Sequence, residues 1–372
     1  MSRKGSRNSS RACSAANVDF AARLIAWQKR HGRHGLPWQA SRDPYAIWLS
    51  EIMLQQTQVA AVIPYYQRFL GRFPDIASLA AASLDEVLAH WSGLGYYSRA
   101  RNLHRAAMLI ATQHGGVFPG DFERILSLPG IGRSTAAAVS VFAFGAKEAI
   151  LDGNVKRVLA RHQGIDGYPG ENAVAAGLWQ AAESLLPQSE LEAYTQALMD
   201  LGATVCTRAR PSCAACPVNG DCVARRDDRI AELPSPRPKK AQPLKRTVML
   251  LLLHGREIFL EKRPPAGIWG GLWSFPEIAP GQRVEDYCLE RFGVHAECTE
   301  PLPLLAHAFT HFKLEITPQP AILATKPQAV NEGEGVWLDM PEAQQAPLPA
   351  PVRKLLKQVG TRVAAGAPGV DS

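Results

Sequence analysis

Four cysteines within seventeen residues most restrict how this 372-residue chain can fold. They are Cys206, Cys213, Cys216 and Cys222, spaced C-x6-C-x2-C-x5-C. The N-terminus has no apolar stretch typical of a secretory signal, so we expect a cytoplasmic protein, in which metal ligation is favoured over disulfides. Four thiolates suit either zinc or a 4Fe-4S cluster. Only one pair has the short spacing of a zinc knuckle, and the compact loop favours the cluster.

The first part of the chain has the composition of an all-helical domain. Residues 18–224 are rich in Ala, Leu and Arg, and alternation typical of strands is scarce. Gly and Pro separate the apolar periodic segments. These segments predict helices at 18–31, 45–56, 59–72, 83–91, 98–114, 121–128, 133–144, 154–162, 173–186 and 190–202.

The remaining segments differ in character. Residues 225–246 are basic and rich in proline, which predicts a linker, and residues 1–17 and 361–372 are predicted to be disordered tails. Between them, residues 247–360 predict an α+β domain. Its expected elements are strands at 248–253, 257–260 and 336–338, and a closing helix at 351–358.

Charge and hydropathy exclude one class of protein and weakly indicate another. The longest aliphatic run, Val248 to Leu253, has six residues, whereas a membrane-spanning helix needs about 20. An integral membrane protein is therefore excluded. The net charge of +7 comes from the N-terminal tail and the linker, so it is only a weak indication of nucleic-acid binding.

A glycine turn joins two of the predicted helices. Pro129 ends the first helix, Gly130 and Gly132 supply a tight turn, and an alanine-rich helix follows. This is a helix-hairpin-helix pattern. The N–H groups of Gly130, Ile131 and Gly132 would then be free to bind a DNA phosphate. A plain packing corner between helices is the alternative.

Two carboxylates stand out. Glu51 lies in the apolar segment Trp48-Leu49-Ser50-Glu51-Ile52-Met53-Leu54, so it is either on the solvent face or in a pocket that raises its pKa. Asp152 precedes a predicted helix, where capping alone would explain it. Residues 93–97, Gly-Leu-Gly-Tyr-Tyr, mix flexible backbone with aromatics ahead of several arginines. Such a loop could insert into a base stack, or pack its aromatics inward.

Taken together, these segments resemble the MutY-type adenine DNA glycosylases, within the helix-hairpin-helix superfamily that includes endonuclease III. The resemblance runs from about residue 18 to about 358. It is carried by the four-cysteine loop and by LPWQ at 36–39, WLSEIMLQQTQVA at 48–60, GLGYYSRARNL at 93–103, LPGIGRSTA at 128–136, ILDGNVKRVLAR at 150–161 and QALMDLGA at 196–203. It implies an all-α helix-hairpin-helix glycosylase domain with a 4Fe-4S cluster held by the loop at 206–222, followed by a Nudix-like domain.

The resemblance also implies an activity. Members of this family act in base excision repair: they flip out adenine mispaired with 8-oxoguanine or guanine in duplex DNA and remove it. We expect a monomer from the cytoplasm of a bacterium. The implied roles are Glu51 as the acid, Asp152 as the carboxylate that stabilises the sugar cation, and Asn154 as its support. Further roles are Trp38, Gln196 and Ser134 at the adenine pocket, Gln56 and Tyr96 inserted into the duplex, Gly130, Ile131 and Gly132 on phosphate, and Phe309, Thr310 and His311 on 8-oxoguanine.

Three departures from related enzymes refine this expectation. Ser134 stands where strand-cutting glycosylases have the lysine that forms a Schiff base, which predicts hydrolysis with little lyase activity. Lys156 is close to the site in sequence, so weak covalent trapping of the DNA by its amine is an alternative. Thr310 replaces the serine of the family's Phe-Ser-His element. The Nudix box departs from the family pattern at 285–290, which predicts that the C-terminal domain has no pyrophosphatase activity.

Three other functions were weighed. An endonuclease III-like glycosylase/lyase for oxidised pyrimidines is disfavoured by Ser134 and by the C-terminal domain. A non-catalytic iron–sulfur DNA-binding protein is disfavoured by Glu51 and Asp152. A Nudix hydrolase is disfavoured by the degraded box.

Overall fold

The computed structural model describes residues 7–238, 241–265, 267–309, 311–327 and 335–364; for 7–18 and 361–364 it describes the backbone alone. Contacts group the chain into two compact units. The first unit contains residues 1–81 and 102–239, and the second contains residues 82–101 and 240–372. Among the described residues, no helix is both long enough and apolar enough to cross a bilayer.

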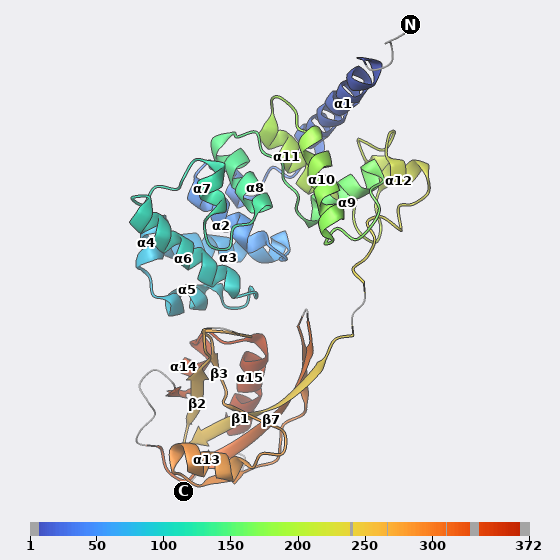
Figure 1. Cartoon of the computed structure of the whole chain (residues 1–372). Coiled ribbons are helices and arrows are strands. Elements are labelled where there is room, and N and C mark those ends of the chain that lie inside the picture. Colours follow the sequence, from blue (N-terminus) through green and yellow to red (C-terminus); the bar gives the residue numbers. More distant parts are fainter. Residues whose placement is uncertain (1–6, 239–240, 266, 310, 328–334, 365–372) are drawn as a thin grey trace. The chain divides into compact units, whose positions relative to one another are not determined.

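The first part of the chain is helical throughout, as predicted (Figure 1). Short helical turns lie at Pro37–Gln39, Leu201–Val205 and Cys213–Ala215. The α-helices are α1 (Arg7–His31), α2 (Pro44–Leu54), α3 (Val59–Arg72), α4 (Ile76–Ala81), α5 (Leu84–Trp91), α6 (Ser98–Gln113), α7 (Phe122–Leu126), α8 (Arg133–Phe144), α9 (Gly153–Gln163), α10 (Asn172–Ser184), α11 (Leu191–Asp200) and α12 (Val223–Arg226).

A core of small and aliphatic side chains joins α1, α8, α9 and α11. Ala137 and Ala138 of α8 are both buried, and their small side chains let α11 approach closely through Ala197. Leu24 of α1 and Leu159 of α9 are fully buried in the same core. This packing fixes the start of α9, which carries Asp152, relative to α11.

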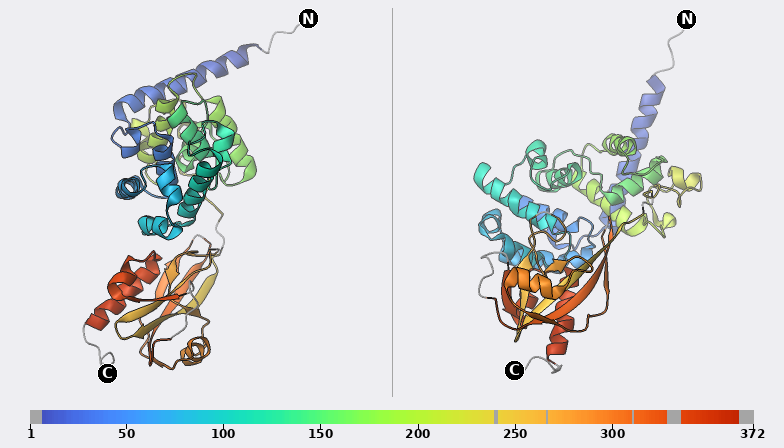
Figure 2. Two further views of the ribbon diagram at one scale, coloured as in Figure 1. Left: turned by 90° about the vertical axis from the view of Figure 1, so that its left-hand side faces the viewer. Right: turned by 60° about the horizontal axis from the view of Figure 1, so that its bottom comes forward.

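Helix α1 begins earlier than expected. Residues 1–17 were predicted to be a disordered tail, but the chain is helical from Arg7. Segment 7–17 contains neither Gly nor Pro, so nothing in the backbone stops α1 from continuing toward the N-terminus. Both views in Figure 2 show this first half projecting away from the other helices of its unit.

The linker is shorter than the predicted 225–246. Its first part stays on the helical unit, where Leu233 is buried and its carbonyl accepts a hydrogen bond of 2.8 Å from Arg161 Nε. Ser235 N donates to the carbonyl of Gly167 at 3.2 Å. Its last residues begin the first strand at Leu244. The closing helix also extends to Ala364, beyond the expected end of the domain at 360.

The C-terminal part is a mixed sheet with helices, which confirms the predicted α+β class. The strand order is β3-β2-β1-β7-β5, with β4 beside β1, β6 beside β7 and β8 beside β2. Strands β1 and β7 are parallel over ten residue pairs, and the other pairs are antiparallel. The elements are β1 (Leu244–His254), β2 (Glu257–Lys262), β3 (Trp273–Ser274), β4 (Glu277–Ile278), α13 (Val284–Phe292), β5 (Ala296–Cys298), β6 (Leu305–Ala308), β7 (Lys313–Leu323), β8 (Gly335–Asp339), α14 (Met340–Gln345) and α15 (Ala350–Ala364).

Helices cover both faces of this sheet. Met249, Leu251 and Leu253 of β1 pack with Leu355 and other residues of α15, whereas the alternate residues of β1 pack with α13. Alternation of side chains along a strand explains this division, because successive residues face opposite sides. Strand β1 is therefore apolar on both faces and reads as a continuous aliphatic run.

Candidate active site

Glu51 is the one acidic residue on the apolar helix α2. Asp43 caps this helix by accepting from Tyr45 N at 3.0 Å, and Pro44 follows at its first position, where proline is well tolerated. Trp48 and Leu49 on the same helix are fully buried. Burial, and then the carboxylate of Asp152, raise the pKa of Glu51 to about 8. Glu51 is thus protonated at neutral pH and able to donate a proton.

Asp152 caps α9 and also lines a cavity, so the capping interpretation is confirmed and its role at the sugar stays a prediction. Its Oδ1 accepts from Val155 N at 2.8 Å. Burial raises the pKa of Asp152 above its usual value, and the N–H groups of Val155 and Asn154 and the charges of Arg157 and Lys156 offset part of that rise. Burial and the charge of Asp152 both raise the pKa of Glu51, so of the two carboxyls Glu51 is the one that favours its protonated form.

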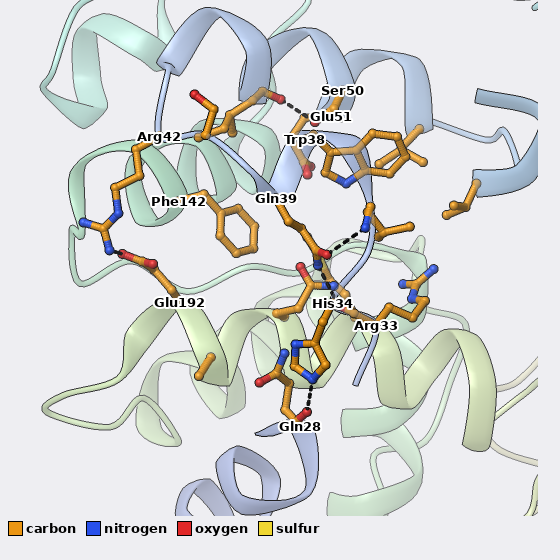
Figure 3. Close-up of a pocket in the computed structure, with 18 residues that line it drawn as sticks. Gln28, Arg33, His34, Trp38, Gln39, Arg42, Ser50, Glu51, Phe142 and Glu192 are labelled. Atoms are coloured by element: carbon orange, nitrogen blue, oxygen red, sulfur yellow. Dashed lines mark hydrogen bonds and ion pairs between the residues drawn. The ribbon is translucent and has the colours of Figure 1, made fainter. Parts of the chain in front are cut away.

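Two adjoining cavities meet at Glu51 (Figure 3 shows the first). The first has a volume of about 330 Å³ and is lined by Trp38 and Gln196 among others. The second has a volume of about 740 Å³. The second is lined by the predicted site residues Gln56, Ser134, Asp152 and Asn154, and both cavities share Arg33, Glu51, Leu54, Val59 and Met199.

Backbone contacts hold the polar residues of the second cavity. Ser134 Oγ accepts from Leu151 N at 3.0 Å, which ties α8 to the residue before Asp152. Asn154 Oδ1 accepts from Arg157 Nη2 at 2.8 Å. The ammonium of Lys156 donates to the carbonyl of Pro169 at 3.5 Å, and Lys156 does not line either cavity. Weak trapping by Lys156 stays an untested alternative.

The sequence analysis missed two residues at the site, Arg33 and Asp200. Asp200 of α11 is 1% exposed and accepts from Arg33 N at 2.8 Å and Arg33 Nε at 2.6 Å. Its Oδ1 also accepts from Gln196 Nε2 at 2.8 Å. Asp200 thus orients Arg33 and Gln196, which both line the first cavity. The available signal was the same as for Glu51, an acidic residue in the apolar run Ala-Leu-Met-Asp-Leu-Gly-Ala.

The predicted hairpin turn is present between α7 and α8. Gly130 has a φ of +80°, and a Cβ there would lie 2.6 Å from Cβ of Asn102, so glycine is required. Gly132 is the N-cap of α8. The expectation of three free N–H groups is wrong for Ile131, because its N–H donates to the carbonyl of Leu128 at 3.2 Å. This hydrogen bond lies within the turn, so the N–H group of Ile131 is not free to bind a phosphate.

Three of the remaining predicted residues, Tyr96, Phe309 and His311, lie in loops. Tyr96 is 50% exposed and has a φ of +48°. Phe309 stacks on Phe312, with ring centroids 4.5 Å apart, in the turn between β6 and β7, and His311 in this turn is exposed. Thr310 lies outside the described residues.

The four cysteines surround one small cavity of about 30 Å³. Arg161 Nη1 donates to Cys206 Sγ at 3.4 Å. Burial, and to a smaller extent the three other cysteines, raise the pKa of Cys216 to about 11. The chemistry of this donor set fits a thiolate-bound metal centre. Among the described residues, which include all four cysteines, no three metal-ligating side chains come together as they would around a single ion.

Comparison with known families matches both parts of the chain. Residues 49–184 match a family described as the HhH-GPD superfamily of base excision DNA repair proteins, and residues 247–358 match the NUDIX domain. A solved thermostable thymine-DNA glycosylase is 29% identical, with a TM-score of 0.53 over 59% of this chain and all of that one. These matches confirm the predicted fold class.

Curated relatives match along most of the chain. The adenine DNA glycosylase of Buchnera aphidicola subsp. Acyrthosiphon pisum is 36% identical over 339 residues, covering 91% of this chain and 97% of the relative. The human adenine DNA glycosylase is 31% identical over 401 residues, covering 91% of this chain and 73% of the relative.

Proposed function

This chain belongs to the adenine DNA glycosylase family of base excision repair, and from that premise we propose that it hydrolytically removes adenine placed opposite 8-oxoguanine or guanine. The observation that carries the proposal is the pair of carboxyl groups at one cavity. Glu51 has a pKa raised to about 8, and Asp152 accepts hydrogen bonds that favour its charge. Such a pair can supply an acid and an anion at one pH.

Each carboxyl has a distinct chemical task. With the flipped adenine in the first cavity, Glu51 donates its proton to a ring nitrogen, because neutral adenine leaves more easily than its anion. The bond from C1′ to the base nitrogen breaks, and its electron pair leaves with the base. The sugar becomes an oxocarbenium ion, which the carboxylate of Asp152 stabilises until water adds to C1′. The products are adenine and an intact strand with an abasic site.

Trp38 and Gln196 are proposed to recognise the base. Trp38 is buried against Tyr66, with ring centroids 5.4 Å apart at 76°, so its ring is rigid. Gln196 is oriented by its hydrogen bond to Asp200. A rigid apolar surface and an oriented amide are the usual means of reading one base edge. Gln56 and Tyr96 are proposed to insert into the duplex, and Gly130 and Gly132 to approach its phosphates.

We also propose that Cys206, Cys213, Cys216 and Cys222 hold a 4Fe-4S cluster. When bound, this group would cross-link the loop that follows α11, and the thiols would supply its four ligands. The four cysteines surround one small cavity, and a set of four thiol ligands supports a metal centre there. Purified protein should contain about four irons per chain. A fully active protein that carries zinc and no iron would exclude the cluster.

Phe309, Thr310 and His311 are proposed to read 8-oxoguanine on the opposite strand. Adenine is a normal base, so its own pocket cannot tell a misplaced adenine from a correct one. 8-Oxoguanine differs from guanine by a donor at N7 and a carbonyl at C8, and the exposed imidazole of His311 can supply a hydrogen bond to one of these atoms.

The decisive experiment is an excision assay on four duplexes. Adenine is placed opposite 8-oxoguanine, guanine, cytosine or thymine, and the strand is analysed with and without alkali. We expect excision opposite 8-oxoguanine and guanine only, with strand breaks that require alkali. Efficient cleavage without alkali would contradict the hydrolytic assignment, and excision of oxidised pyrimidines instead would favour the endonuclease III-like alternative.

A further inference from the structure

We propose that the first cavity has a second opening, between Ser41, Arg42 and Glu192, through which the free base leaves while the DNA is still bound. This inference rests on the proposed function. It concerns what happens after the glycosidic bond has broken, when the base has to leave a site whose entrance the product DNA still covers.

The two cavities define the direction of entry. The sugar must reach Asp152 and the base must reach Glu51, so the nucleotide enters through the second cavity, which Asp152, Asn154 and Gln56 line. Residues shared by both cavities, including Glu51 and Leu54, mark the passage between them. With the abasic sugar beside Asp152, this passage leads back only to the bound duplex.

The first cavity continues past Glu51 to a different group of residues. Ser41 and Arg42 from the loop before α2, and Glu192 from the first turn of α11, line it and do not line the second cavity. In the view of Figure 3, Arg42 and Glu192 lie on one side of Phe142, and Glu51 and Trp38 lie on the other. The cavity therefore has a wall remote from the carboxyl pair.

This wall is at the protein surface. Arg42 Nη2 and Glu192 Oε1 are 2.6 Å apart, and their side chains are 71% and 38% exposed. Exposed ion pairs contribute at most about 1 kcal/mol, so this one can open and close readily. Ser41 beside it is also exposed. The Arg42–Glu192 ion pair thus closes this side of the first cavity only weakly. The cavity has a volume of about 330 Å³, which is within the range of small-molecule sites.

The interior between the carboxyl pair and the Arg42–Glu192 ion pair suits a neutral purine. Phe142 and Ala193 give it apolar walls, and Gln28 and Gln39 give it amide groups. A base that has just received the Glu51 proton leaves without charge, so it can cross an apolar wall without a large desolvation cost.

The test compares base release with DNA release. Full-length protein in excess is mixed with a duplex that carries radiolabelled adenine opposite 8-oxoguanine or guanine. One sample is quenched in alkali to count abasic sites, and another is passed rapidly through a filter that retains the protein–DNA complex. We expect labelled adenine in the filtrate while the abasic DNA is still retained. Appearance of adenine only as the DNA dissociates would overturn the proposal.

Two variants narrow the opening from opposite sides. Ser41→Trp and Glu192→Trp should slow the appearance of labelled adenine by about tenfold relative to the formation of abasic sites in the same sample. Ala176→Trp, at an exposed position of α10, is the matched control and should leave both rates unchanged. If both opening variants release adenine at the native rate, the exit route is wrong. If no duplex loses adenine, the proposed function fails instead, so the two failures are distinguishable.

Discussion

At the scale of single residues, the central feature is a pair of carboxyl groups, Glu51 and Asp152, that line one cavity. Burial and the Asp152 charge raise the pKa of Glu51 to about 8, so its acid form is the stable one below that pH. As pH rises through about 8, Glu51 ionises and can no longer donate. The single-turnover excision rate should therefore fall above about pH 8, and it should also fall at acid pH, where Asp152, whose pKa burial raises, becomes protonated.

Glu51→Gln is the control for this pH dependence. Glutamine is similar in size and neutral, but it cannot transfer a proton, so the rate should fall by about 10²–10⁴-fold at every pH. The alkaline limb should also disappear from its profile. A native profile that stays flat to pH 9 would assign the acid role to another group.

Asp152→Asn separates the two roles of Asp152. Asparagine is as good an N-cap as aspartate, so thermal stability should be nearly unchanged. The negative charge beside the sugar is lost, and excision should slow by about 10³-fold, a typical effect of removing one electrostatic partner of a transition state. The rate is measured by single turnover and the stability by thermal unfolding; a large loss of stability would mean that capping is the main role.

Ser134→Lys tests why the strand is left intact. Ser134 lines the cavity that contains Asp152, so a lysine amine there would be within the site that holds C1′. We expect a DNA adduct that borohydride traps in this variant and little in the native protein. Equal trapping in both would point to another amine, such as that of Lys156.

The candidate carboxylates could be predicted from the sequence, but their partners could not. Glu51 stands out because its helix is otherwise apolar, and Asp200 stands out in the same way. However, Arg33 is 167 residues away from Asp200 along the chain. Only the packing of α1 against α11 brings them together, and no local pattern contains that information.

At the scale of elements, the hairpin turn depends on one glycine more than on the other. Gly130→Ala should lower stability by about 1–2 kcal/mol, because a φ of +80° is strained for alanine, and its Cβ would also meet Asn102. Gly132→Ala is the matched control, since its φ is −94° and nothing lies within 4 Å of an added Cβ. Thermal unfolding measures both; equal losses would show that backbone conformation is not the cause.

The first and last residues of a helix could be predicted where glycines or other residues that end helices flank it. Helices α3 (59–72) and α8 (133–144) have the predicted bounds. Glycines at 132 and 145 flank α8, and Gly145 ends it in the left-handed conformation. Helix α4 was missed because six residues carry too little periodicity, and the start of α1 was misplaced because its composition resembles that of a disordered tail.

At the scale of the whole molecule, excision and lesion reading should be separable. Thr310→Val keeps the shape of the side chain and removes its hydroxyl, so the ratio of excision opposite 8-oxoguanine to that opposite guanine should fall by roughly fivefold, about 1 kcal/mol. Thr299→Val, an exposed position in the same domain, is the control and should keep the native ratio. An unchanged ratio in both variants would remove Thr310 from lesion reading.

The sequence did not predict how most of the strands in the sheet pair with one another. The adjacent strands at 248–253 and 257–260 were predicted, and they pair as the β1–β2 hairpin with Gly255 in the turn. The central parallel pair, β1 with β7, was not predicted, because its two strands are far apart along the chain and only β1 has a continuous aliphatic run.

The double-sided burial of β1 has a consequence for how the chain is made. A ribosome adding about 5–20 residues per second completes β1 at His254 several seconds before it reaches β7 at Lys313. During that interval an aliphatic strand has left the exit tunnel without its parallel partner, and such strands associate with one another. Nascent chains that stop between these strands should therefore aggregate, and binding by a holding chaperone should protect the growing chain until β7 emerges.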